Sequence, residues 1–114
     1  MKLSEKKCKP CEGGIPPLTM EQISVLRKEI HPDWKVKEGK LIIRDFRFVN
    51  FKQSMHFVTK VAQLAEEEGH HPDLKVGYGY CTIELSTHAI NGLSGNDFIL
   101  AAKIDSLSLN ELTL

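Results

Sequence analysis

Residues 69–88 read GHHPDLKVGYGYCTIELSTH, and this stretch carries the strongest structural signal in the chain. Apolar residues alternate with polar residues or glycine on both sides of Gly79-Tyr80, which is the period of a half-buried β-strand. A two-residue turn centred on Gly79-Tyr80 would use the ability of glycine to adopt a positive φ. The stretch therefore predicts a β-hairpin with one apolar face.

The predicted turn also sets the register of this hairpin. It pairs Tyr78 with Cys81, Val76 with Ile83, Leu74 with Leu85 and, on the other face, Lys75 with Glu84. The same register places His71 opposite His88 at the open end of the hairpin. We therefore expect these two histidines to be neighbours in space.

Helices are predicted on both sides of the hairpin. Asn50 and Gln53 are the N-cap and N3 residues of one helix, which Gly69 ends as a C′ glycine. Ser94 and Asp97 take the corresponding N-terminal positions of the last helix. The apolar stripes expected to face the core are Phe51, Met55, Val58, Ala62 and Ala65, widened by Phe57, Val61 and Leu64, and Leu100, Ala101, Ile104 and Leu107.

A further helix and hairpin are predicted upstream. Thr19 and Gln22 form a capping box, and Pro32 stops this helix near Ile30. A tight turn at Glu38-Gly39 then pairs Val36 with Leu41 and Trp34 with Ile43.

The predicted order is α-β-β-α-β-β-α. It indicates an α+β domain in which helices pack on one face of a four-stranded antiparallel sheet. Residues 1–17 are polar and end in glycines and prolines, so we expect an irregular N-terminal arm followed by a single domain over 18–114.

The composition excludes several classes of protein. Of 114 residues, 41% are hydrophobic, and 15 Lys and Arg balance 15 Asp and Glu, as in an ordinary folded domain. The neutral balance gives no reason to expect a nucleic-acid or membrane partner. No apolar stretch approaches the roughly 20 residues of a spanning helix, and no apolar run follows the charged Met1–Lys7. We therefore expect a cytoplasmic protein.

The three cysteines do not form a disulfide framework. Cys81 falls in an apolar alternating run, which is typical of a buried thiol. Cys8 and Cys11 form a CxxC, which elsewhere binds zinc or acts as a redox pair. Since no second pair accompanies it and no strand precedes it, we interpret it as part of a loose arm outside the functional site.

The candidate functional residues are His70, His71 and His88, because the hairpin register brings them together. The acidic run Glu66–Glu68 at a helix C-terminus opposes the helix dipole, and such broken local rules are frequent at functional sites. Histidines that merely fill a loop beside a solvated acidic face are the alternative. A functional cluster would either bind zinc or act without a metal as a general acid and base. His31 and His56 are expected at the surface.

These residues resemble a known family, the pterin-4a-carbinolamine dehydratases. The resemblance extends over roughly Leu18 to Ile104 and rests on Glu66-Glu67-Glu68-Gly69-His70-His71-Pro72, Leu85-Ser86-Thr87-His88, Gly92-Leu93-Ser94 and Asp97. Trp34 and the aromatic strand Phe46–Phe48 leading into Phe51 also fit.

The resemblance implies a lyase that dehydrates 4a-hydroxytetrahydropterins to quinonoid dihydropterins in tetrahydropterin recycling, without a metal or cofactor. His70 and His88 would transfer protons, and His71 would mainly hold the pterin. Further contacts to the pterin would come from Gly69, Ser86 and Thr87, and the supporting carboxylates would be Glu66 and Asp97.

The resemblance also concerns partners. Family members are typically homodimers or homotetramers, and the apolar strand Leu41–Val49 is compatible with a subunit interface. Animal members also bind a homeodomain transcription factor as dimerisation cofactors, which is the alternative function. The family often has an aromatic residue where this chain has Leu74, so substrate preference can differ.

Overall fold

The computed structural model describes residues 2–10 and 13–111 of the chain. Its elements are η1 (Leu3–Glu5), α1 (Met20–Arg27), β1 (Lys35–Lys37), β2 (Leu41–Arg47), α2 (Phe51–Glu68), β3 (Asp73–Gly77), β4 (Tyr80–Leu85), η2 (His88–Ile90) and α3 (Gly95–Glu111). Elements η1 and η2 are short 3-10 helices. The α-helices and strands follow in the order α-β-β-α-β-β-α, which confirms the predicted α+β class.

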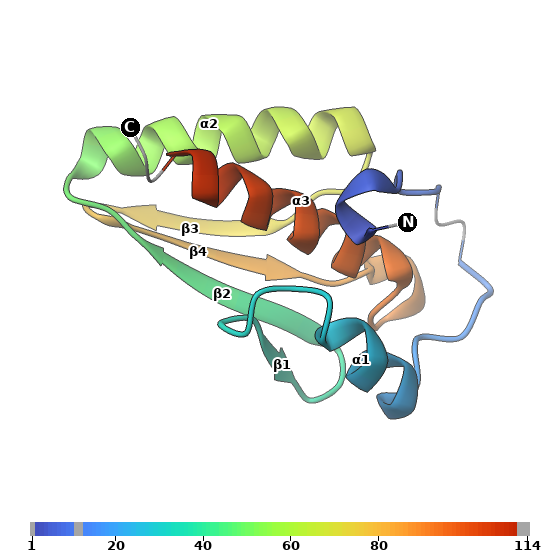
Figure 1. Cartoon of the computed structure of the whole chain (residues 1–114). Coiled ribbons are helices and arrows are strands. Elements are labelled where there is room, and N and C mark those ends of the chain that lie inside the picture. The colour runs from blue at the N-terminus through green and yellow to red at the C-terminus, as the bar shows by residue number, and fades with distance from the viewer. Residues whose placement is uncertain (1, 11–12, 112–114) are drawn as a thin grey trace.

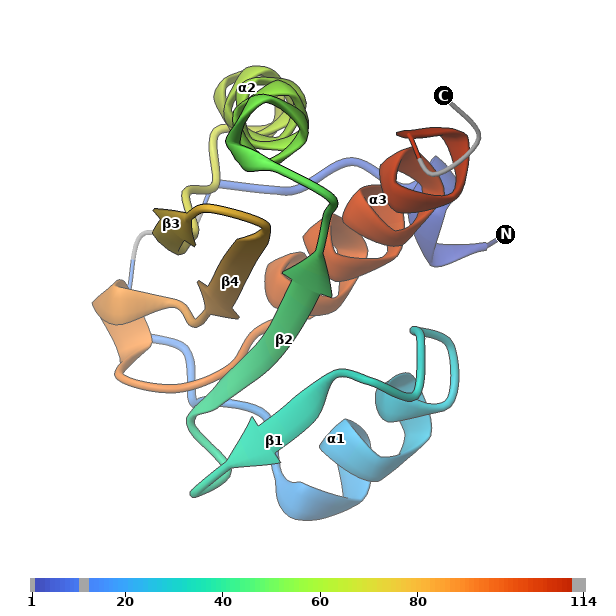
Figure 2. The same ribbon diagram turned by 90° about the vertical axis from the view of Figure 1, so that its left-hand side faces the viewer.

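The four strands form one antiparallel sheet in the order β1-β2-β4-β3 (Figure 1). The two central strands come from different hairpins and pair from Ile42–Leu85 to Arg47–Tyr80. Figure 2 shows α1, α2 and α3 along one face of this sheet. The loop after α2 and the loop after β4 therefore both lie at the end of the molecule where α3 begins (Figure 1).

The capping residues lie where the local sequence predicts them. Thr19 and Gln22 exchange side-chain and backbone hydrogen bonds, which completes the capping box of α1. The Asn50 side chain accepts the Gln53 N–H at the start of α2. Gly69 ends α2 in the left-handed conformation with a φ of 64°. All these predictions are confirmed, because capping depends on residues close in sequence.

The prediction for the buried face of α2 is correct for Phe57, Val61 and Ala65 but wrong for the residues of the first turns. Phe51 and Met55 are 49% and 40% exposed, so their assignment to the core was wrong. The ring centre of Phe57 instead lies 4.7 Å from that of Phe46 and 5.2 Å from that of Phe48. Because α2 has apolar residues on two adjacent faces, its packing against β2 selects which face is buried. The buried residues of α2 are Ser54, Phe57, Val61 and Ala65.

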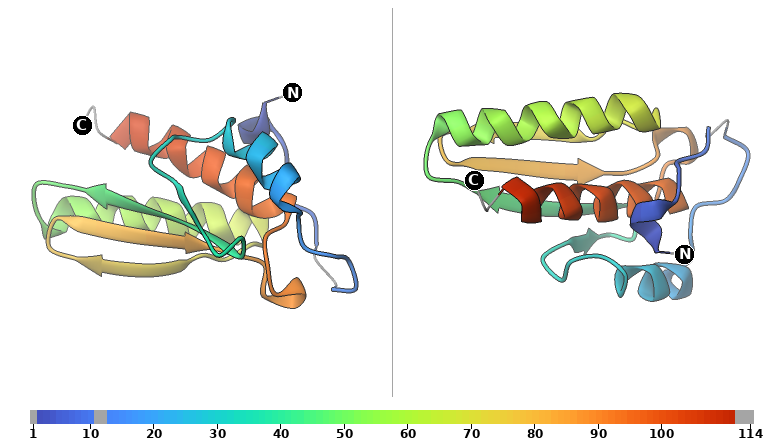
Figure 3. Two further views of the ribbon diagram at one scale, coloured as in Figure 1. Left: turned by 90° about the horizontal axis from the view of Figure 1, so that it is seen from below. Right: turned by 45° about the horizontal axis from the view of Figure 1, so that its top comes forward.

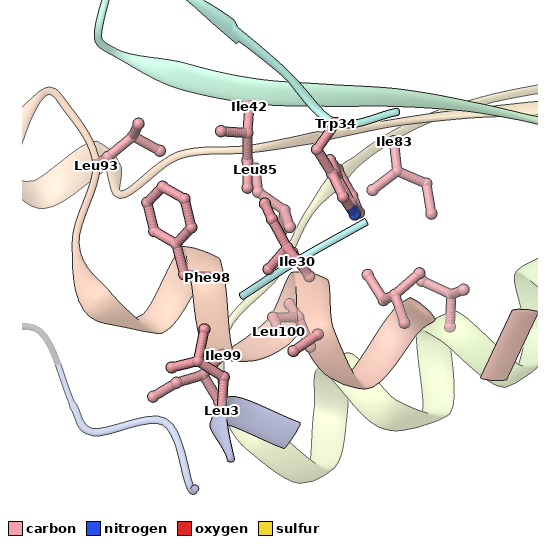
Figure 4. Packing of buried hydrophobic residues seen from close by; sticks show 14 of the residues in the cluster. Leu3, Ile30, Trp34, Ile42, Ile83, Leu85, Leu93, Phe98, Ile99 and Leu100 are labelled. Carbon is pink, nitrogen blue, oxygen red and sulfur yellow. The ribbon is translucent and has the colours of Figure 1, made fainter. Parts of the chain in front are cut away.

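Helix α3 packs across the centre of the sheet. Figure 4 shows Ile42, Ile83 and Leu85 from the central strands on one side of the core, with Phe98 and Leu100 of α3 on the other. Each of these side chains is fully buried, which contributes about 1.5–3 kcal/mol per side chain. The predicted α3 residues Leu100, Ala101 and Ile104 are confirmed as core residues.

The register of the β3–β4 hairpin differs from the prediction by two residues. Val76 pairs with Cys81 rather than Ile83, and the turn is centred on Tyr78-Gly79 rather than Gly79-Tyr80. Gly79 has a φ of 80°, and its carbonyl oxygen accepts the Phe48 N–H at 2.8 Å. A shift of two residues leaves every side chain on its original face, so the apolar pattern alone does not distinguish the two registers.

The β1–β2 hairpin is shifted by one residue. The predicted turn forms, with positive φ at Glu38 and Gly39, but Lys37 pairs with Leu41 because Lys40 is an additional loop residue. Trp34 therefore precedes β1 instead of pairing within it. Its indole N–H donates to Asp105 of α3 at 2.8 Å, and its side chain is fully buried.

The N-terminal arm is packed against the domain, so the expectation of a loose arm is wrong for the described part of it. Leu3 is 4% exposed and belongs to the hydrophobic core (Figure 4). Cys8 is half-buried, and its backbone N–H donates to Glu68 of α2 at 2.8 Å. Cys11 lies outside the described residues.

Replacing Gly79 by Ala will destabilise the protein by about 1–3 kcal/mol, because the left-handed backbone disfavours a side chain. An added Cβ would also lie 2.9 Å from the Phe48 carbonyl oxygen. Urea unfolding measures the change. Gly95→Ala is the matched control, since a Cβ there would meet no atom within 4 Å other than those of its chain neighbours and its own helix backbone, and alanine favours a helix. Equal unfolding free energies for the two variants would contradict this assignment of the turn.

Candidate functional site

A pocket of about 230 Å³ lies where α2, β4 and α3 meet. All six residues predicted to contact a substrate line it: Gly69, His70, His71, Ser86, Thr87 and His88. The remaining described lining residues are Lys9, Ala89 and Asn96. The three histidines predicted to converge therefore face one pocket, although the register that led to this prediction was wrong. Leu74 is not among the described lining residues.

His70 is held by a buried carboxylate. Its Nε2 atom lies 2.6 Å from Oδ1 of Asp97, whose side chain is 0% exposed. His70 follows Gly69, whose left-handed conformation ends α2 and redirects the chain toward the pocket. An ionised Asp97 accepts a hydrogen bond from the Nε2–H group, which leaves Nδ1 as the basic nitrogen of the neutral ring.

The second oxygen of Asp97 joins the β4–α3 loop to α3. Oδ2 accepts the Thr87 hydroxyl at 2.8 Å and the Ser94 N–H at 2.9 Å. Since the single Thr87 hydroxyl proton is used in this way, the Ser94 hydroxyl donates to Thr87. Thr87 also pairs with Gly92 in an isolated β-bridge that closes the loop containing η2. Asp97 therefore holds both the His70 ring and the β4–α3 loop that forms the pocket wall.

The other two histidines, His71 and His88, are exposed and interact more weakly with carboxylates. Nε2 of His71 lies 2.5 Å from Oε2 of Glu66, but these side chains are 62% and 77% exposed. Nε2 of His88 lies 3.9 Å from Oδ2 of Asp73, which is too long for a hydrogen bond. Solvent screening weakens both interactions relative to the buried His70–Asp97 pair.

Two glutamates of the acidic run at the end of α2 make identifiable contacts. Glu66 contacts His71, and Glu68 accepts the Cys8 N–H and lies 3.6 Å from Lys103. This Cys8 hydrogen bond and then the Lys103 ammonium hold the pKa of Glu68 below its ordinary value. Glu66 and Glu68 therefore connect the end of α2 to the pocket and to the arm.

Neither of the two described cysteines, Cys8 and Cys81, supplies a thiolate to this site. Burial, followed by the Glu68 carboxylate, raises the pKa of the Cys8 thiol to about 12, and burial raises that of Cys81 to about 11. Both thiols are therefore protonated at neutral pH. Cys81 is fully buried, as predicted. Within residues 2–10 and 13–111, no three His, Cys, Asp or Glu side chains are grouped so as to hold a metal ion.

Sequence reasoning missed three lining residues, Lys9, Ala89 and Asn96. Lys9 is part of the CxxC segment that we expected to lie outside the site. Asn96 adjoins Asp97, and nothing in its local sequence indicates that its side-chain amide binds the backbone of Lys9. These contacts join residues from opposite ends of the chain.

In the described part of the chain, no helix is long and apolar enough to span a bilayer.

Comparison with known sequences identifies the same family as the motifs. The sequence model described as pterin 4 alpha carbinolamine dehydratase matches residues 16–107. A Nitrosomonas europaea protein with the provisional name pterin-4-alpha-carbinolamine dehydratase is 51% identical over 105 residues, covering 92% of each chain. A Methylococcus capsulatus protein with the same provisional name is 50% identical over 107 residues, covering 93% of each chain.

Two solved structures are also similar. A transcriptional coactivator/pterin dehydratase from Brucella melitensis has a TM-score of 0.75 and 27% identity, covering 81% of this chain and 98% of that chain. A pterin dehydratase-like protein identified as a RuBisCO assembly factor in the alpha-carboxysome has a TM-score of 0.58 and 26% identity, covering 68% of this chain and 92% of that chain. Since the family model matches residues 16–107 and the Nitrosomonas europaea and Methylococcus capsulatus relatives are about half identical over more than nine-tenths of the chain, this chain belongs to the pterin-4-alpha-carbinolamine dehydratase family.

Proposed function

We propose that this protein dehydrates 4a-hydroxytetrahydropterins to quinonoid dihydropterins in tetrahydropterin recycling, in the cytoplasm. The observation that carries the proposal is the pairing of His70 with the buried Asp97, in a pocket that His71 and His88 also line. The family and its relatives support the same class of substrate. The reaction as proposed uses neither a metal nor a cofactor.

The proposed reaction requires two proton transfers. The C4a–OH bond breaks, a ring nitrogen loses its proton, a C=N bond forms and water leaves. A base must take the nitrogen proton while an acid protonates the departing hydroxyl. We assign the base to His70. Its Nε2 atom is bound to Asp97, which leaves Nδ1 of the neutral ring to accept the proton. Protonated His88 is the proposed acid, and its exposure allows it to regain a proton from solvent.

The remaining pocket residues are proposed to position the substrate. His71 is held by Glu66 and by the conformational restriction of Pro72, which suits a ring that binds the pterin. Gly69 and Ser86 offer polar contacts at the pocket wall. Because the Thr87 hydroxyl already donates to Asp97, we propose that Thr87 acts on the substrate through that carboxylate.

Protein binding is the second candidate function. Val49, Phe51 and Met55 are exposed apolar residues near the start of α2. We propose that a second copy of the chain covers them in a homodimer or homotetramer. Sedimentation equilibrium tests this. A monomeric protein would instead favour a different protein as the partner at this surface. The two structural neighbours carry names of this kind, a transcriptional coactivator and an assembly factor.

Replacing His70 or His88 by Ala will lower kcat for dehydration of a synthetic 4a-hydroxytetrahydropterin by about 10²–10⁴-fold, as expected for a general acid or base. The two substitutions will combine less than additively, because both groups act on one transition state. His71→Ala will raise KM more than it lowers kcat. Near-full turnover by a variant lacking both His70 and His88 would refute the assignment.

Replacing Asp97 by Asn will lower kcat more than replacing Glu66 by Gln. Asp97 is fully buried and orients His70, whereas Glu66 is 77% exposed and its interaction is screened by solvent. We expect a decrease of about 10–100-fold for Asp97→Asn, equivalent to about 1.4–2.8 kcal/mol, and less than threefold for Glu66→Gln. Thermal unfolding of both variants separates lost orientation from lost folding. Equal kcat values in two folded variants would be evidence against the role of Asp97.

Activity will survive exhaustive chelation followed by gel filtration, since acid–base catalysis by histidines requires no metal. Metal analysis by mass spectrometry accompanies the assay. Loss of activity on chelation, with recovery on adding stoichiometric zinc, would favour a three-histidine metal enzyme instead.

A further inference from the structure

The N-terminal arm forms part of the pocket wall through an unusual side-chain contact. The Lys9 N–H donates to Oδ1 of Asn96 at 2.9 Å, and Nδ2 of Asn96 donates to the Lys9 carbonyl oxygen at 2.6 Å. The side-chain amide of Asn96 thus forms hydrogen bonds with both the backbone N–H and the backbone carbonyl group of Lys9. Asn96 is 8% exposed, so this pair fixes the Lys9 backbone much as an adjacent strand would.

Neighbouring residues fix the arm on either side of this contact. The Cys8 N–H binds Glu68, and the Cys8 thiol lies 3.6 Å from the Asn96 carbonyl oxygen. Further toward the N-terminus, Leu3 is buried against the core. The right-hand view of Figure 3 shows the N-terminal segment beside the beginning of α3. The arm therefore has a defined position beside the pocket.

Lys9 brings a positively charged side chain to this position. Among the described lining residues, it alone carries a charge at neutral pH that does not depend on titration of a histidine. The Lys9 side chain is exposed, whereas its backbone is held by Asn96. A flexible ammonium on a fixed backbone is suited to donating a hydrogen bond to a carbonyl oxygen of a bound ring.

We propose that Lys9 is a substrate-binding residue, whose ammonium donates to the carbonyl oxygen of the pterin ring. Asn96 is the positioning residue that holds the Lys9 backbone at the pocket. This inference rests on the proposed dehydratase function and adds the N-terminal arm to its binding site. It replaces the expectation that the CxxC segment lies outside the site.

Steady-state kinetics of the full chain test the role of the Lys9 charge. Lys9→Met keeps most of the side-chain length, and we expect it to raise KM by about threefold to tenfold while kcat changes less than twofold. Lys9→Arg keeps the charge and should restore most of the affinity. Lys7→Met is the matched control, since Lys7 is an exposed residue of the same arm that is not among the described lining residues. Its KM should equal that of the wild type.

The role of Asn96 has a readout independent of catalysis. Asn96→Ala should release the arm and accelerate tryptic cleavage after Lys6 and Lys7, whereas Lys9→Met should leave this rate unchanged. Asn96→Ala should also raise KM, with little further increase when combined with Lys9→Met, because both changes remove one interaction. If Asn96→Ala unfolds, the Lys9 variants still decide the binding role, since the Lys9 side chain is exposed.

The outcomes separate this inference from the proposed function. An active wild type whose KM is unchanged by Lys9→Met would overturn the role of Lys9 and leave the dehydratase proposal intact. A decrease in kcat without a change in KM would also overturn a binding role. A wild type with neither turnover nor pterin binding would refute the proposed function, and the inference with it.

Discussion

The buried carboxylate of Asp97 is the interaction on which the rest of the site depends. It accepts hydrogen bonds from His70, which follows α2, and from Thr87 and the Ser94 backbone, which both lie in the β4–α3 loop. A carboxylate without such partners would be costly to bury, so its desolvation is offset only when both segments are in place. The fold and the candidate catalytic geometry are therefore stabilised by the same group.

The contrast between the histidines follows from this arrangement. His70 is half-buried and oriented by a carboxylate that solvent does not reach, whereas His71 and His88 are exposed at the rim. A rigid ring suits a base that must meet one substrate atom, and exposed rings can exchange protons with water or adapt to a bound molecule. The pocket thus combines a fixed inner wall with an accessible rim.

The N-terminal arm extends this wall beyond the part of the chain that the family model matches, which begins at residue 16. Leu3 is buried in the core and Lys9 lines the pocket, so the arm contributes both to packing and to the site. Because the Cys8 thiol is half-buried and protonated, its visible contribution is packing and backbone attachment rather than thiolate chemistry. The CxxC motif is therefore a poor guide to what this segment does.

The sequence by itself determined the order of elements, the helix caps and the set of pocket histidines. Caps such as Asn50 with Gln53 depend on residues one turn apart, and the histidine motifs follow the ends of α2 and β4 directly. Only the tertiary structure decided the β3–β4 register, the buried face of α2 and the contact between Lys9 and Asn96. A strand pattern with a period of two residues looks the same after a shift of two, and a helix with two apolar faces needs a partner to select one. The Lys9–Asn96 contact joins residues 87 positions apart in sequence, so only folding of the whole chain brings them together.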